Sequence, residues 1–249
     1  MKKTLIYDLS TRLFHWSFAI LFVGAFFITN VFEDESSVFP YHMMIGLLMT
    51  FIILLRIIWG IVGTKYARFS SYILSPTALI KYFKGMFTKN SKRELGRNPA
   101  SSWAALFMIA ISIGLAVTGY LITTPSKTEL LEEIHELLAD GFLIIVLLHI
   151  AGVILHTLRH KDPIAKSMVT GYKNPIDDSS TGIENNSNIV AFVFVVLVVI
   201  FISLMANGYD PKQRTLDFPG IQIKLEEMET DKNEYTNEYK REKEYDDDD

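Results

Sequence analysis

The sequence of 249 residues contains no cysteine at all. This absence excludes disulfides, cysteine-ligated iron–sulfur clusters, thiolate zinc sites and a covalently attached c-type haem within the chain. Any redox metal that it holds must therefore be bound by histidine, methionine or carboxylate side chains.

Charge is scarce in most of the chain and concentrated at its end. The last 43 residues, 207–249, hold 14 acidic and 7 basic residues, whereas residues 1–206 carry a net charge of only +3. The formal net charge of −4 therefore describes a mildly basic, apolar body that is followed by an acidic extension.

Long hydrophobic runs fill that body. A membrane span needs roughly 20 mostly apolar residues, because the hydrocarbon core of a bilayer is about 30 Å thick. Five stretches meet this length, and we predict an all-α integral membrane protein with a transmembrane domain over residues 1–206. The predicted spans are 13–32, 41–63, 103–123, 134–158 and 188–206.

The basic residues of the connections predict how the chain lies in the membrane. Fifteen lysines and arginines fall on one side, in residues 1–12, 64–100 and 159–187. The opposite connections, 33–40 and 124–132, hold only Lys127. Since basic loops stay in the cytoplasm, we expect a bacterial inner-membrane protein with a cytoplasmic N-terminus and a periplasmic tail.

The tail, residues 207–249, is expected to be largely disordered. Residues 207–223 include Pro211, Pro219 and Gly220 and are typical of an irregular connector. Past about residue 224 the composition is too charged to bury a core. Two hypotheses carry equal weight: a solvated end without a role, and a docking segment for a basic external partner.

Ionisable residues inside a bilayer are costly and usually functional. Five of the six histidines lie in or at the ends of predicted spans, and His160 lies in a loop; the other five are His15, His42, His135, His149 and His156. A single such histidine is more often structural than a ligand, but several at matched depths point to a cofactor.

The depths of four histidines match in pairs. Within span 134–158, His149 follows His135 by 14 residues, which corresponds to ~21 Å along the helix and about 40° around it. His42 shares the level of His135, and His15 shares the level of His149. Two histidine pairs at two levels are what two bis-imidazole haems b require, whereas zinc usually needs more ligands per site.

Other residues on these faces are candidates for cofactor contacts. Gly46 and Gly152 are as compatible with ordinary helix packing as with close approach of a macrocycle. Arg56 is favoured as a partner of a haem propionate over a side chain that extends to the cytoplasm. His156 is compatible with three roles: replacing His149 as a ligand, contacting a propionate, or lying near a quinone.

An ordered set of motifs over residues 5–172 resembles the prokaryotic cytochrome b561 family, which includes the b-type cytochrome subunit of membrane-bound nickel–iron hydrogenases. The motifs are Tyr7-Asp8-Leu9-Ser10-Thr11-Arg12-Leu13-Phe14-His15-Trp16, His42-x3-Gly46-x9-Arg56-x2-Trp59-Gly60, Gly63-x2-Tyr66-Ala67-Arg68-Phe69, Gly96-x-Asn98-Pro99, Thr118-Gly119, and His135-x13-His149 followed by His156-x3-His160-x-Asp162 and Met168-x2-Gly171. The acidic tail lies outside this pattern.

The resemblance implies a four-helix haem-binding bundle with His15/His149 and His42/His135 as axial pairs, to which the fifth span is added. It also implies electron exchange with quinone and with a redox partner, either a hydrogenase-like enzyme or a periplasmic c-type cytochrome. We therefore predict a dihaem cytochrome b that serves a quinone-linked oxidoreductase as an electron-transfer subunit, without catalytic residues of its own and without a nucleic-acid partner. The alternative is a haem-free transporter or scaffold with structural histidines.

Overall fold

The computed structural model describes residues 3–88, 93–125, 128–162, 164–177, 180–218 and 220–225. Five of its helices are long and apolar enough to cross a membrane, which confirms the predicted fold class. These helices are α1 (Leu9–Val31), α2 (Phe39–Val62), α4 (Pro99–Ile122), α5 (Glu129–His160) and α7 (Asn188–Gly208). The chain is a multi-pass membrane protein, and its outward faces expose aliphatic side chains as a lipid environment requires.

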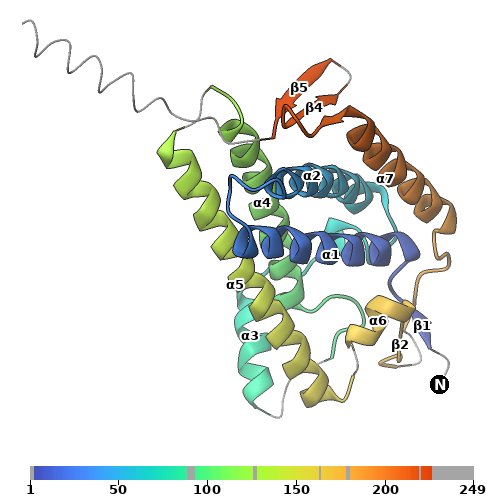
Figure 1. Ribbon diagram of the computed structural model, residues 1–249. Coiled ribbons are helices and arrows are strands. Elements are labelled where there is room, and N and C mark those ends of the chain that lie inside the picture. Colours follow the sequence, from blue (N-terminus) through green and yellow to red (C-terminus); the bar gives the residue numbers. More distant parts are fainter. Residues whose placement is uncertain are drawn as a thin grey trace, which may run out of the picture.

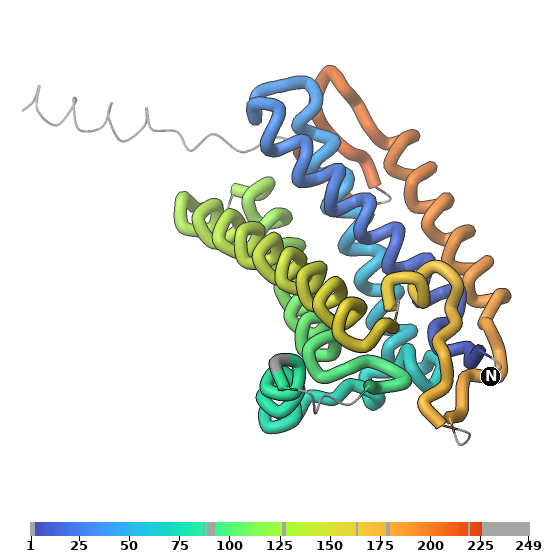
Figure 2. The backbone as a smooth tube through the Cα atoms, turned by 90° about the horizontal axis from the view of Figure 1, so that it is seen from below, coloured from blue at the N-terminus to red at the C-terminus, as the bar shows by residue number. Residues whose placement is uncertain are grey.

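Four of the long helices form two antiparallel pairs, α1 with α2 and α4 with α5, and the pairs are joined where α2 packs against α4. Helix α7 packs on α1 and α2, on the side away from α5 (Figures 1 and 2). We call the end where α1, α4 and α7 begin the basic end of the bundle, after its lysines and arginines. The opposite end, where α2 and α5 begin, is called the acidic end.

Polar residues at the helix starts satisfy the free amides there. At the start of α4, the Asn98 side chain accepts a hydrogen bond from the Ser101 amide. At the start of α5, the Thr128 side chain accepts one from the Leu131 amide. Helix α5 ends at Lys161, which adopts a left-handed conformation with φ 52°.

The loop between α2 and α4 carries a helix that the sequence reasoning did not predict. After a short 3-10 turn, η1 (Phe69–Ser71), helix α3 (Pro76–Phe87) begins behind the capping Ser75. It packs on α4 and exposes Ile80 and Phe83. Exposed apolar side chains interspersed with lysines are typical of a helix that lies in the membrane interface.

Asp8 joins the start of α1 to the end of α2. Its carboxylate is fully buried and accepts hydrogen bonds from the Thr11 amide at 2.7 Å, from Trp59 Nε1 at 3.3 Å and from the Thr64 hydroxyl. A buried carboxylate is tolerated only with such partners. This single residue therefore caps one helix and fixes the position of the next.

At the basic end, the chain just before α1 pairs with the chain that follows α6. Strand β1 (Thr4–Leu5) pairs antiparallel with β2 (Tyr172–Lys173), which follows the short helix α6 (Ile164–Thr170). The amides of Ile6 and Tyr7 donate to the carbonyl of Gly171. Gly171 has φ +86°, and a Cβ there would lie 2.7 Å from the Tyr7 oxygen, so this turn requires glycine.

The segment 207–223 is not an irregular connector, and that prediction was wrong. It forms a three-stranded antiparallel sheet of β3 (Tyr209–Asp210), β4 (Thr215–Phe218) and β5 (Ile221–Lys224). Pro211 lies in the first turn rather than in a strand. The second turn contains Gly220 at φ +90°.

The sheet is held against the acidic end of the bundle by an apolar core. Leu216 and Leu225 are buried together with Met205 of α7 and with Leu48 and Ile52 of α2. The side chains of alternate strand residues thus face the helices, which the proline and glycine content of the segment obscured. The predicted disorder of the tail from residue 226 onward concerns residues outside those that the structure describes.

We expect Leu216→Ala to loosen this sheet, since deleting a fully buried leucine side chain costs about 2–5 kcal/mol. Limited proteolysis in detergent should then cleave between residues 208 and 225 faster than in the wild type. Ile221→Ala is the matched control, because Ile221 lies in the same sheet but is largely exposed. Equal cleavage rates in the two variants would contradict the role given to Leu216.

Candidate functional site

The structure brings the four histidines together in the two predicted pairs. His15 of α1 lies near His149 of α5 in the half of the bundle toward the basic end, close enough for their charges to interact. His42 of α2 lies correspondingly near His135 of α5 at the acidic end. Helix α5 thus contributes one imidazole to each pair, while the second imidazole comes from a different helix.

At the acidic end, both imidazoles are oriented through Nδ1. His42 Nδ1 lies 3.2 Å from the Ala25 carbonyl oxygen of α1, to which it donates. His135 Nδ1 lies 2.8 Å from the Thr118 hydroxyl oxygen, and that hydroxyl donates to the Gly114 carbonyl at 3.0 Å. Fixing Nδ1 in this way leaves Nε2 of each ring as the nitrogen that can bind a metal.

The Thr118-Gly119 motif explains how α4 supports His135. A Cβ at Gly119 would lie 3.2 Å from His135 Cε1, a distance tighter than ordinary van der Waals contact. The glycine therefore lets the imidazole lie directly against α4, where the neighbouring Thr118 reaches Nδ1. Thr118 and Gly119, which the sequence shows only as the end of a helix, therefore position the imidazole of His135.

At the basic end, His15 Nδ1 is buried without a hydrogen-bond partner. The neighbouring Trp16 packs edge-on against the His15 ring, with centroids 5.2 Å apart. Its Nε1 donates to the Met168 carbonyl at 3.0 Å, which ties this turn of α1 to α6. Buried polar atoms normally have a bonding partner, and a metal ion that binds the imidazole ring is one such partner.

A glycine follows one histidine of each pair and leaves room beside it. A Cβ placed at Gly46 of α2 or at Gly152 of α5 would meet no atom within 4 Å. Gly46 lies one turn after His42, and Gly152 lies nearly one turn after His149. The two glycines therefore border open space rather than tight helix contacts. The residues present fit haem groups held by histidine pairs.

An aromatic cluster lies between the two pairs and was missed by the sequence reasoning. Phe142 of α5 is buried and packs on Phe22 and Phe18 of α1, at ring-centroid distances of 4.9 and 6.1 Å. It is seven residues from His135 and seven from His149, so it lies on their face of the helix at mid-distance. This seven-residue spacing is the feature of the sequence that could have predicted the position of Phe142.

Arg56 lies inside the protein rather than extending to solvent. Its side chain is 3% exposed, and Nη2 donates to the Ala67 carbonyl and to the Tyr72 hydroxyl, each at 2.9 Å. The guanidinium lies over the rings of Phe14 and Phe69. Nη1 is buried and makes no hydrogen bond. This position is compatible with a carboxylate partner that would occupy Nη1.

His156 belongs to a separate polar cluster. It is 2% exposed, and its Nδ1 lies 3.0 Å from the Tyr82 hydroxyl of α3. Its Nε2 lies 4.0 Å from Asp162 Oδ2, which is 3.3 Å from Arg93 Nε. The imidazole therefore faces α3 and the turn after α5 rather than His15, which favours His149 as the partner of His15.

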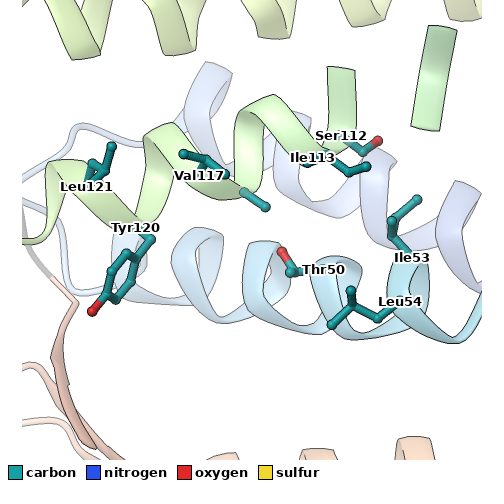
Figure 3. Close-up of a pocket in the computed structure, with 9 residues that line it drawn as sticks. Thr50, Ile53, Leu54, Ser112, Ile113, Val117, Tyr120 and Leu121 are labelled. Carbon is teal, nitrogen blue, oxygen red and sulfur yellow. The ribbon is translucent and has the colours of Figure 1, made fainter. Parts of the chain in front are cut away.

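A groove of about 340 Å³ runs between α2 and α4 (Figure 3). Its lining includes Leu54, Val117 and Tyr120, which are about half exposed. The two other hydroxyl groups of the lining, on Thr50 and Ser112, donate to carbonyls of their own helices. The groove thus offers an apolar surface on the lipid side rather than a redox site.

The candidate sites are pairs and not larger clusters. Over the part of the chain that the structure describes, no group of three or more His, Cys, Asp or Glu residues gathers where it could hold a metal ion. A haem iron takes four of its ligands from the macrocycle and needs only two axial side chains from the protein. Histidine pairs that lie between membrane helices are therefore typical of a b-type cytochrome.

Comparison with known proteins agrees with this class. The family model described as "Prokaryotic cytochrome b561" matches residues 6–171, and the chain belongs to this family. The match contains both histidine pairs, α1 to α5 and the turn at Gly171. It ends before α7 and the three-stranded sheet. The protein is therefore a membrane b-type cytochrome of this family, and the family implies haem b as its cofactor.

Two curated relatives are similar to the chain over part of their length. Both are described as "Probable Ni/Fe-hydrogenase 1 B-type cytochrome subunit", one from Escherichia coli (strain K12) and one from Escherichia coli O157:H7. Each is 22% identical over 140 residues, covering 47% of this chain and 59% of the relative. The chain thus spans less than two thirds of the relatives it matches. No solved structure matches it significantly.

Burial of Tyr82 raises its pKa to about 12. Because the unfolded phenol titrates near ~10, the neutral form favours the folded state. This stabilisation is fully present below about pH 10 and is lost as the pH rises toward 12. We expect the apparent Tm of the wild type to fall more steeply over this range than that of Tyr82→Phe.

Tyr120→Phe is the matched control for this measurement, because the Tyr120 side chain is about half exposed on α4. Its removal should leave the steep fall between pH 10 and 12 in place. If Tyr82→Phe shows the same pH profile as the wild type, the phenol of Tyr82 does not contribute in this way.

Proposed function

We propose that the protein is a dihaem cytochrome b. One haem b is bound by His15 and His149, and the other is bound by His42 and His135. The observation that carries this proposal is the placement of one histidine of each pair on a single helix, α5, each close to a histidine of another helix. Two levels of paired imidazoles support an electron relay from one end of the bundle to the other.

Each haem, when bound, supplies reversible one-electron chemistry at its iron. The protein's own residues hold and orient the ligands. Thr118 and the Ala25 carbonyl fix Nδ1 of the acidic-end histidines and so direct Nε2 toward the cofactor. Phe142 fills the interior between the two levels and keeps water out of it, which helps to set the redox potential of both sites.

Arg56 and His156 are assigned supporting positions near the basic-end haem. Arg56 is proposed to contact a haem carboxylate, because its buried Nη1 has no other partner. His156 is proposed to act from the polar cluster with Tyr82 and Asp162, as a residue near a propionate or a quinone head group rather than as an iron ligand.

The proposed orientation places the basic end in the cytoplasm of a bacterial cell and the acidic end outside the inner membrane. The distribution of lysine and arginine between the loops supports it. The three-stranded sheet and the acidic tail would then lie in the periplasm.

The proposed partners follow from this geometry. Quinone or quinol from the membrane exchanges electrons at one haem, and an external redox protein does so at the other. Similarity to a hydrogenase b-type cytochrome subunit supports a hydrogenase-like partner. The acidic tail supports a basic partner such as a periplasmic c-type cytochrome, attracted by charge. In either case the chain is the electron-transfer subunit of a quinone-linked oxidoreductase.

The absorption spectrum of the purified protein tests the proposal directly. We expect a b-type band on reduction, and a haem assay that gives about two haems per chain, because the structure offers two histidine pairs. A colourless protein would instead support the alternative of a haem-free transporter or scaffold. A single haem per chain would leave only one of the two pairs as a ligand set.

Separate alanine substitutions assign the ligands. His42→Ala and His149→Ala should each remove roughly one haem and leave the other in place, because each breaks one axial pair. His160→Ala, at the end of the same helix as His149, is the control and should retain both haems. Haem loss in His156→Ala but not in His149→Ala would reverse the assignment at the basic end. The readout is haem content by pyridine haemochrome.

A further inference from the structure

A second arginine lies beside the basic-end histidine pair. Arg97, which directly precedes the cap of α4, is close enough to both His15 and His149 for its charge to act on them. Its guanidinium lies over the Tyr72 and Tyr7 rings, 4.9 and 5.9 Å from their centroids. Its Nε is buried and makes no hydrogen bond.

Arg56 is its neighbour, and the two guanidinium groups are close enough to repel each other. Tyr72 links them, because its hydroxyl accepts from Arg56 Nη2 while its ring supports Arg97. Each arginine therefore has one buried nitrogen without a partner, Nη1 in Arg56 and Nε in Arg97. Both are held by contacts that leave these nitrogens free.

Among the described residues, no carboxylate is in direct ion-pair contact with Arg56 or Arg97. At the basic end, Arg93 instead pairs with Asp162. Asp8 is near Arg56, but its oxygens already accept from Thr11, Trp59 and Thr64. Arg56 is buried and Arg97 is partly buried, and two like charges close together in a low-dielectric interior repel each other. An anion bound beside the two guanidinium groups would offset this repulsion.

The backbone at Arg97 is held firmly from both sides. Lys173 Nζ donates to the Gly96 carbonyl at 3.0 Å, and a Cβ at Gly96 would lie 2.7 Å from the Tyr66 ring. On the other side, Asn98 caps α4 through the Ser101 amide. Arg97 thus belongs to a positioned turn, its guanidinium lies over the rings of Tyr7 and Tyr72, and its charge acts on His15 and His149.

We infer that Arg97 and Arg56 together bind the carboxylates of the haem held by His15 and His149. This inference rests on the proposed function and adds a binding residue, Arg97, to it. A guanidinium group bonds carboxylates with charge-assisted hydrogen bonds. An anionic lipid head group presents similar chemistry, and the experiment below separates the two.

The charge pair also sets the electrostatics of this haem. Reduction adds an electron, so a nearby positive charge stabilises the reduced form. The acidic-end pair has a different environment, in which the charge that reaches His42 is that of Asp34. Neutralising either arginine should therefore lower the midpoint potential of one haem and leave the other unchanged.

The first test is a redox titration of the holoprotein carrying Arg97→Gln. We expect both haems to be present, with one of two midpoint potentials shifted to a lower value and the other as in the wild type. Arg97→Lys, which keeps the charge, should restore part of the shift. Arg68→Gln is the matched control, since Arg68 lies in the loop between α2 and α4 but is exposed. Two unchanged potentials in Arg97→Gln would overturn the inference.

The second test uses apoprotein reconstituted with haem b or with its dimethyl ester, which lacks carboxylates. With haem b, Arg97→Gln should weaken binding at one site by about tenfold to a hundredfold, the range for a lost hydrogen bond to a charged group. With the ester, wild type and Arg97→Gln should bind equally.

Two further outcomes count against the inference. If the Arg97→Gln effect persists with the ester but disappears in nanodiscs of neutral phosphatidylcholine, the anion is a lipid head group and the haem assignment is wrong. If both proteins bind haem b equally, Arg97 does not contact it. A wild type that binds no haem would refute the proposed function itself, which the spectrum reports independently of Arg97.

Discussion

The bilayer offers no hydrogen bonds, and this constraint governs the whole structure. Backbone groups are satisfied within helices, and each polar side chain between them must find a partner inside the protein. Asp8, His42 and His135 have such partners in backbone and side-chain groups. A few buried nitrogens do not, including His15 Nδ1 and Arg56 Nη1. The sites that the protein leaves for a cofactor are recognised by these unmet requirements.

Helix α5 unites the two candidate haem sites. It presents His135, Phe142 and His149 at intervals of seven residues on one face. The same helix therefore supplies a candidate ligand at each level and the buried aromatic ring between them. Such a helix fixes the spacing of the two sites through its own hydrogen-bonded rise. Helices α1 and α2 provide the second candidate ligand of each pair, and hydrogen bonds to Ala25 and Thr118 orient the two acidic-end rings.

The region beyond the family match forms a distinct layer of the molecule. Helix α7 and the three-stranded sheet cover α1 and α2 on the side away from α5, and they share an apolar core with α2. They contribute none of the four paired histidines. In the proposed orientation, the sheet would form part of the periplasmic surface of the protein.

The sequence by itself determined the five spans and the relative depth of the histidines, because the period of the helix and the thickness of the bilayer translate directly into residue spacing. Its ordered motifs also indicated the family of the protein. It did not determine the sheet after α7, because Pro211 and Gly220 are as typical of irregular backbone as of the turns of a sheet. In the structure they occupy the turns, while Leu216 packs on α2.

Only the tertiary structure decided which polar groups lack partners. In the sequence, Arg97 is an ordinary loop arginine. In the folded protein, it lies close enough to His15 of α1 and His149 of α5 for its charge to act on both. Phe142 likewise became a barrier only because α1 delivers Phe18 and Phe22 to it. Contacts between residues far apart in the chain depend on packing, which local spacing does not encode.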